Sequence, residues 1–153
     1  LTIIVSFQSL ILDMAGNVGT QSLAVTIRVL MDETLTGRQK LELVCKEGRI
    51  GLLNGLILGA ASCGVVGLYI MLFKAKTAAF AFGISGCIGV ALLLAMAVSS
   101  IVGTCVPLLF KKLGVDPAVA AGPLITTLND LTAVVAYYGL AWLLLINTFG
   151  FGA

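Results

Sequence analysis

Two acidic residues lie inside long apolar stretches of the sequence, where residue type alone points to chemistry. Asp13 and Asp130 are each flanked on both sides by mostly apolar residues. A carboxylate at the centre of a bilayer costs about 3 kcal/mol on insertion scales unless something compensates its charge. We therefore expect both aspartates to face a partner, an ion or an aqueous path rather than lipid.

Around the first aspartate, polar and small residues recur at steps of three and four. The stripe consists of Asp13, Gly16, Asn17, Thr20, Gln21 and Ala24. Residues at this spacing share one face of an α-helix. The pattern predicts a helix whose polar stripe lines an aqueous path, or whose amides and hydroxyls bond to a neighbouring helix.

The second aspartate has a similar neighbourhood. Thr126 and Thr127 precede Asp130 by one helical turn, and Gly122 and Pro123 precede it by about one turn more. Proline has no N–H, so a helix running through this proline leaves the carbonyl four residues earlier without its usual partner. We expect that carbonyl, which belongs to Val119, to be available to an ion.

The oxygen groups on the two stripes suit a hard cation. Asn17 lies about 20 Å by helical rise from the first loop and Asp130 about 18 Å from the third, so the two reach similar depth. Carboxylate, amide and carbonyl oxygens bind Mg²⁺, Ca²⁺ or Mn²⁺ better than soft metals, and Mg²⁺ usually keeps several waters. The sequence predicts a metal site of Asp130, Asn17 and Asp13, completed by a second subunit that doubles the charge.

The elements that must position these residues are apolar and long. The chain has 153 residues, of which 59% are hydrophobic and 10% charged, and its mean hydropathy is +1.13. A membrane-spanning helix needs about 20 apolar residues. We therefore predict an all-α, multi-pass membrane helical bundle. Its predicted spans are residues 1–31, 50–73, 80–110 and 118–147, with an amphipathic surface helix in the linker 32–49.

Helix ends and packing faces also have sequence signals. Thr36 and Gln39 stand at capping-box spacing, and Gly48 suits the end of the linker helix. Asp116 and Pro117 suit the N-cap and first position of the last helix. Glycines at 51, 55 and 59 form a ridge that allows close helix packing.

Basic residues set the expected orientation. They cluster around the first and third loops, with two lysines in the second: Arg28, Arg38, Lys40, Lys46, Arg49, Lys111 and Lys112 against Lys74 and Lys76. Because such residues are retained on the cytoplasmic side, the first and third loops are expected there. Both ends of the chain then face outward, which predicts one more helix upstream in a longer protein of the cell (inner) membrane.

Composition sets several function classes aside. A net charge of +2 provides no basic surface for nucleic acid. The sequence has no histidine, and its four cysteines lack CxxC spacing, so zinc, haem and disulfide frameworks are not indicated. Without a histidine or a nucleophile in a catalytic context, we expect no enzyme activity.

The runs AGNVGTQS at 15–22 and GVDPAVAAGPLITTLNDLTAVV at 114–135 resemble the two motif helices of the MgtE family of Mg²⁺ channels and transporters, which is related to a family of eukaryotic solute carriers. The resemblance implies a homodimer with five membrane helices per subunit and a pore between the subunits. It also implies that Asp130 holds the hydrated Mg²⁺ and that Asn17 lies beside its path. The full-length protein would add N-terminal cytoplasmic sensor domains, which this chain does not contain.

Alternatives stay open at this point. A carrier that exchanges the divalent cation for Na⁺ or H⁺ would need a second ion site, for which Asp13 is the obvious candidate. A non-conducting membrane scaffold would explain the glycine ridge but not the buried acids. Asn129 and Thr132 are expected in packing contacts. Aromatic residues near the last helix's end, Tyr137, Tyr138 and Trp142, are expected in an interfacial belt.

Overall fold

A computed structural model of the chain describes residues 5–32, 34–120 and 123–143. Its elements are α2 (Gln8–Asp32), α3 (Gly37–Phe73), α4 (Ala78–Lys112), the short 3₁₀ helix η1 (Pro117–Ala120) and α5 (Pro123–Ala141). No strand occurs among the residues described. The predicted all-α class is confirmed.

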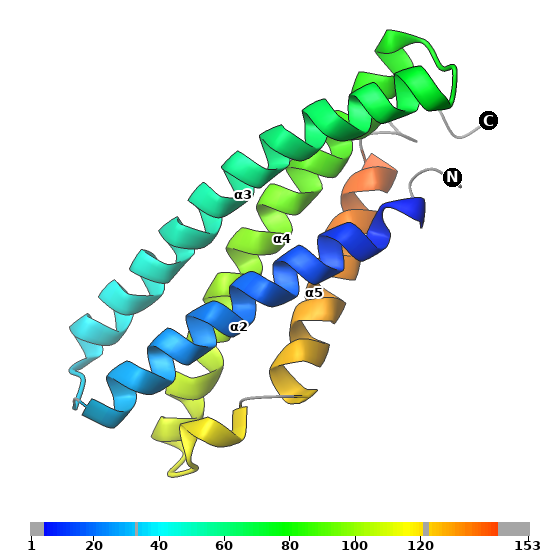
Figure 1. Cartoon of the computed structure of the whole chain (residues 1–153). Coiled ribbons are helices and arrows are strands. Elements are labelled where there is room, and N and C mark those ends of the chain that lie inside the picture. Colours follow the sequence, from blue (N-terminus) through cyan, green and yellow to red (C-terminus); the bar gives the residue numbers. More distant parts are fainter. Residues whose placement is uncertain (1–4, 33, 121–122, 144–153) are drawn as a thin grey trace.

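Helix α4 is the centre of the arrangement. Helix α3 runs alongside it on one face, and α2 and α5 pack against it elsewhere (Figure 1). Helix α4 consequently has more buried residues than its neighbours, among them Ile88, Leu92 and Met96. Ser99 on α4 donates a hydrogen bond of 2.6 Å from its hydroxyl to the carbonyl of Ala15 on α2, so this hydroxyl joins two helices.

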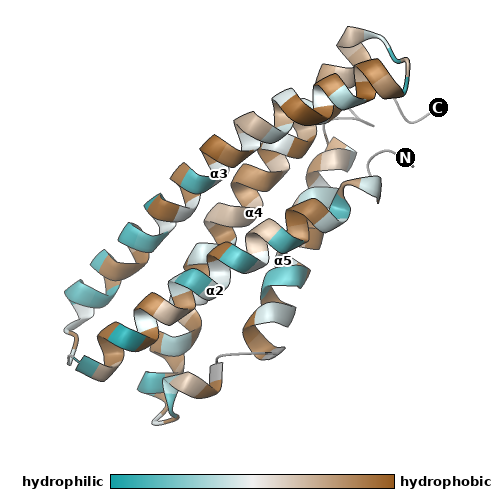
Figure 2. Ribbon diagram, viewed as in Figure 1, coloured by the Kyte–Doolittle hydropathy of each residue, from teal (hydrophilic) through white to brown (hydrophobic). Residues whose placement is uncertain are grey.

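Helix α3 joins two segments that the sequence had separated. The capping box is present, because the Thr36 side chain accepts from the Gln39 N–H and the Gln39 side chain accepts from the Thr36 N–H. From there the helix continues for 37 residues. The predicted break at Gly48 is wrong: this glycine stays helical and lies against Ile101 on α4. Figure 2 shows hydrophilic bands in the first part of α3 and mainly hydrophobic residues beyond.

The glycine ridge on α3 packs as predicted. A Cβ at Gly55 would lie 2.7 Å from the backbone of Leu93, and a Cβ at Gly59 would lie 2.6 Å from the carbonyl oxygen of Gly89. Gly51 is also buried against α4. Close backbone contact replaces side-chain packing along this seam, which we call the α3–α4 seam.

The connection from α4 to α5 corrects the expected start of the last helix. Gly114 adopts a φ of 74° after α4, a conformation that glycine accepts easily. Asp116 accepts a hydrogen bond of 2.9 Å from the N–H of Ala118, but Pro117 begins η1 rather than the long helix. Helix α5 begins at Pro123. A proline suits the first turn of a helix and disrupts the interior, which explains the later start.

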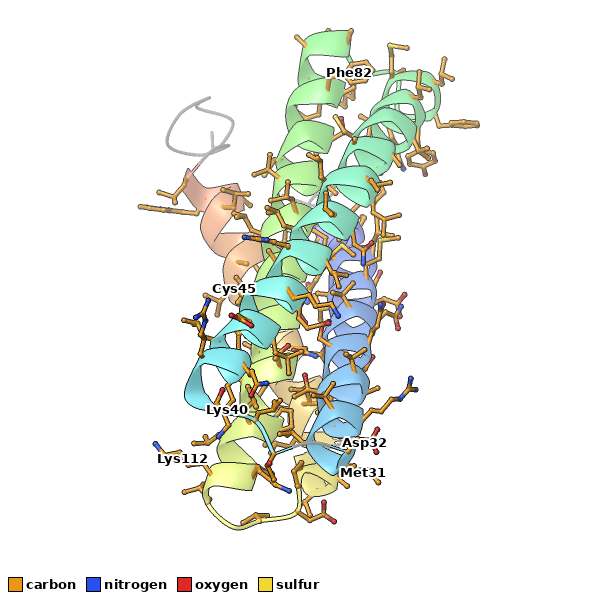
Figure 3. All side chains as sticks on the ribbon, turned by 90° about the vertical axis from the view of Figure 1, so that its left-hand side faces the viewer. Met31, Asp32, Lys40, Cys45, Phe82 and Lys112 are labelled. Atoms are coloured by element: carbon orange, nitrogen blue, oxygen red, sulfur yellow. The ribbon has the colours of Figure 1, made fainter. Side chains whose placement is uncertain are left out.

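Charged residues gather at one end of the bundle. Met31, Asp32, Lys40 and Lys112 lie at that end, and Phe82 lies at the other (Figure 3). The first and third connections therefore lie at the same end, as their basic residues predicted. The side of a membrane that this end faces stays a prediction.

Two helices in the described residues are long and apolar enough to cross a membrane, α3 and α4. The predicted count of four spans therefore stays a prediction, and residues 1–4, 121–122 and 144–147 of the outer two lie outside the described part of the chain.

One aromatic expectation is wrong. Tyr137 is fully buried in the main hydrophobic cluster. Its neighbour Tyr138 donates a 2.6 Å hydrogen bond from its hydroxyl to the side-chain oxygen of Gln8 on α2. Only Trp142 is exposed as an interfacial aromatic would be. Helix α5 turns Tyr137 toward α2 and α4 because this position shares a face with buried Ala133 and Ala141.

Candidate functional site

A cavity of about 460 Å³ lies between α2 and α5. Its lining consists of Ser9, Leu12, Asp13, Gly16, Asn17, Thr20, Thr126 and Asp130. Six of these residues were predicted as ion-binding or pore-lining, and they come from helices more than 90 residues apart in sequence. The two polar stripes therefore face each other across one space.

The α2 side of the cavity presents a run of oxygen atoms. The Asn17 amide nitrogen lies 3.5 Å from a carboxylate oxygen of Asp13 and donates to it. The Thr20 hydroxyl donates to the carbonyls of Gly16 and Asn17, at 2.9 and 3.0 Å. All three hydrogen bonds stay within α2, so they hold the Asn17 and Thr20 side chains along their own helix. The amide oxygen of Asn17 receives no hydrogen bond from any described residue and is available to a cation or its water.

The α5 side supplies a second carboxylate. Asp130 is half-buried and Thr126 is exposed, and both line the cavity because they are one helical turn apart. Within the described residues, no hydrogen bond or ion pair reaches the Asp130 carboxylate. Its charge therefore acts on the contents of the cavity without compensation from any described residue.

Among the described residues, two predicted pore-lining residues, Val119 and Thr127, are not part of the lining of this cavity. Val119 is 62% exposed on η1, and Thr127 is exposed beside the cavity. Because α5 begins at Pro123, no helix runs through this proline, and the availability of the Val119 carbonyl to an ion stays a prediction without that support. Gly122 lies outside the described residues.

A second cavity of about 590 Å³ continues along α2 toward the charged end. It shares Thr20 with the first and is otherwise lined mainly by apolar side chains, namely Leu23, Ala24, Ile27, Met31 and Ala118, with Arg28 and Asp32 at its end. The two cavities follow one face of α2 from Ser9 to Asp32. This face changes from acidic and polar to apolar before it reaches the charged end.

The donor set fits a hydrated ion better than a dehydrated one. No group of three or more histidine, cysteine or acidic residues occurs among the described residues. Mg²⁺ gives up its water reluctantly and usually keeps several waters, and the carboxylate, amide and hydroxyl oxygens here can accept hydrogen bonds from that water shell. The cavity has room for such a shell.

Sequence reasoning missed one buried acidic residue and did not foresee the environment of one buried amide. Glu47 on α3 is 1% exposed and has no hydrogen bond or ion pair to any described residue. Its position one turn before Gly51, on the face that meets α4, was the signal that would have found it. Asn129 was assigned to packing and is indeed fully buried, but neither of its amide atoms has a hydrogen-bond partner.

Gln21 does not join two helices within the described residues. Its side chain is exposed and makes no hydrogen bond there. Thr132 donates to the carbonyl of Leu128 on its own helix at 2.7 Å. Hydrogen bonds between α2 and α4 come instead from the Ser99 hydroxyl and from the Lys111 ammonium, which donates to the carbonyl of Leu30 at 3.4 Å.

Comparison with known proteins agrees with the motif resemblance. The family profile "MgtE: Divalent cation transporter" matches residues 8–140. "Magnesium transporter MgtE" of Enterococcus faecalis is 39% identical over 140 residues, which are 92% of this chain and 29% of that protein. Proteins of the same name from Bacillus subtilis and Thermus thermophilus are 35% and 33% identical, over 88% and 94% of this chain and 28% and 30% of theirs. The chain thus spans under a third of the length of these relatives.

Proposed function

Because this chain belongs to the MgtE family of divalent cation transporters, we propose that it carries Mg²⁺ across a membrane along the face shared by α2 and α5. One observation supports this best: Asp130, Asn17 and Asp13 line a single cavity although they come from the two ends of the chain. The names of the relatives identify magnesium as the cargo of those proteins. Mn²⁺ and Co²⁺ present the same charge to the same oxygens and belong to the proposal as further cargo.

The proposed mechanism is electrostatic. The uncompensated carboxylate of Asp130 attracts the cation and holds it through its water shell. Asn17 and Thr20 on the opposite wall offer oxygens to the same shell. Weak contact through water lets the ion leave as readily as it enters, which conduction requires.

The proposed assembly is a homodimer with the ion path between two copies of the α2–α5 face. One Asp130 per chain balances only half of a divalent charge, and a two-fold axis beside the cavity would bring a second Asp130 to the same path. The complete protein in this proposal is a multi-pass protein of the cell membrane. Its cytoplasmic sensor domains are contributed by segments beyond this chain.

A coupled exchanger is the second candidate, and Asp13 is the observation that favours it. A second carboxylate in the same cavity could hold Na⁺ or H⁺ in alternation with the divalent cation. Replacing Asp13 with asparagine distinguishes the two mechanisms. Flux of an exchanger would lose its dependence on the second ion's gradient, whereas a channel would show no such dependence before or after the change.

Mg²⁺ flux into liposomes containing the full-length protein tests the main proposal. We expect Asp130→Ala to lower the initial flux at least about tenfold, which corresponds to about 1.4 kcal/mol of lost ion stabilisation. The matched control is Glu42→Gln, which removes an acid that is 61% exposed and paired with Arg38. Flux that falls in both variants, or in neither, would contradict the assignment of the ion to Asp130.

A further inference from the structure

The side chain of Asn129 is buried without any hydrogen bond. It is 0% exposed, and its amide nitrogen and oxygen both lack a hydrogen-bond partner among the described residues. A buried amide with no partner destabilises a fold, and an apolar residue of similar size would avoid that cost. The presence of the amide here therefore needs an explanation other than a stabilising hydrogen bond.

The amide lies directly against the backbone of Gly19 on α2. A Cβ at Gly19 would collide with the Asn129 amide nitrogen, and it would lie 2.6 Å from the amide carbon and 2.5 Å from the Ser99 hydroxyl oxygen. On another side, the carbonyl of Gly19 meets Gly103 on α4. Gly19 thus lies at the point where α2, α4 and α5 come together, with no room for a side chain.

The shape of an amide suits this contact. The amide carbon of asparagine is planar, so the group can lie flat against a peptide backbone. The branched carbon of a leucine at the same place would hold two methyl groups out of the plane and push the helices apart. Shape rather than hydrogen bonding explains why an unpaired amide is found here.

Consecutive residues of an α-helix point about 100° apart. With Asn129 directed at Gly19, its neighbour Asp130 turns toward the cavity lined by Asp13 and Asn17. We propose that Asn129 is a positioning residue for the ion: its amide, seated on Gly19, sets the rotation of α5 and so holds Asp130 on the cavity side. This inference rests on the proposed function, in which Asp130 holds the transported cation.

Three variants of the full-length protein test the proposal by Mg²⁺ flux at increasing Mg²⁺ concentration. Asn129→Ala frees α5 to rotate and should raise the half-saturating Mg²⁺ concentration about tenfold with maximal flux per folded protein largely kept. Gly19→Ala should impair the ion site at least as much, because its methyl group displaces the amide. The double variant should be less impaired than Gly19→Ala alone, because the new methyl group fills the space that the amide leaves.

Gly64→Ala is the matched control, since a Cβ at Gly64 on α3 meets nothing within 4 Å. A merely structural role for Asn129 would lower the amount of folded protein and leave the half-saturating concentration of the remainder unchanged. That result, or a double variant as impaired as Gly19→Ala, overturns the proposal. If Gly19→Ala is not recovered from the membrane, the half-saturating concentration of Asn129→Ala decides alone.

Asp130→Ala, measured beside these variants, separates this inference from the function it rests on. Native flux in Asp130→Ala would overturn the proposed function. Lost flux in Asp130→Ala together with a native half-saturating concentration in Asn129→Ala would overturn only the positioning role.

Discussion

Glycines line both the α3–α4 seam and the cavity between α2 and α5, but their surroundings differ. Gly59 and Gly89 face each other across the seam with their backbones in contact, whereas a Cβ at Gly16 beside the cavity would meet nothing within 4 Å. The seam uses the missing side chain to bring two helices together. At the cavity the missing side chain leaves space open. Spacing of small residues alone does not tell these uses apart.

Acidic residues differ between the same two regions. Glu47 on the seam side of α3 is buried, while Asp13 and Asp130 have access to a cavity. A carboxylate can act on an ion only where an ion can reach it. We therefore expect the seam to serve helix packing and the cavity to serve ion binding. Four substitutions test this contrast, given from the largest expected effect to the smallest.

The largest effect is expected from Gly55→Leu in the seam. The new side chain would meet the backbone of Leu93, whose atoms lie 2.7 and 2.9 Å from an added Cβ. We expect a loss of about 3 kcal/mol in the free energy of unfolding, near the upper end for overpacking, measured by thermal unfolding in detergent. Gly64→Leu on the same helix is the control, and equal losses in both variants would refute close packing at the seam.

Glu47→Gln tests the acid of the seam. The substitution keeps the shape and removes a carboxylate that no described residue pairs with, so we expect the free energy of unfolding to rise by about 1.5 kcal/mol. Mg²⁺ flux should stay within about twofold of the native rate, a factor that corresponds to about half a kcal/mol. A fall in stability would show that Glu47 is paired in the folded protein, and a lost flux would place chemistry in the seam.

Gly16→Ala is expected to act in the opposite sense to Gly55→Leu. Nothing lies within 4 Å of the added methyl group, and alanine favours a helix over glycine by about 1 kcal/mol. Thermal unfolding should therefore move to higher temperature. Destabilisation would mean that this side of α2 is packed in the complete protein and would weaken the contrast with the seam.

The smallest effect is expected from Ser99→Ala, at the contact that links the two regions. The substitution removes the 2.6 Å hydrogen bond to the carbonyl of Ala15. Hydrogen bonds between membrane helices contribute about 0.6 kcal/mol on average. We expect the free energy of unfolding to fall by the same amount, measured by chemical denaturation. Ser100→Ala is the control, since the Ser100 hydroxyl donates to Ala97 on its own helix and its loss should cost less.

The parts of the fold that follow from periodicity were predictable. The polar stripes of α2 and α5 lie across one cavity because three- and four-residue steps set a helix face, whatever the neighbours are. The α3 ridge packed closely for the same reason. These predictions needed no knowledge of which helices touch.

Other features depend on tertiary contacts that a local pattern does not contain. Gly48 stays helical because it packs against Ile101, more than 50 residues away. Tyr137 is buried because α5 turns it inward, although its residue type suits an interface. Pro123 was expected inside a helix and is instead the first residue of α5, which depends on where the chain leaves η1.

The length of α3 has a mechanical consequence. Its 37 residues span about 55 Å at 1.5 Å per residue, while a hydrocarbon core is about 30 Å thick. A helix that crosses such a core therefore extends well beyond it as one rigid rod, with its charged first turns outside. Those charged turns are continuous, within one unbroken helix, with the glycine contacts to α4, so the part of α3 outside such a core and the part packed inside it form a single element.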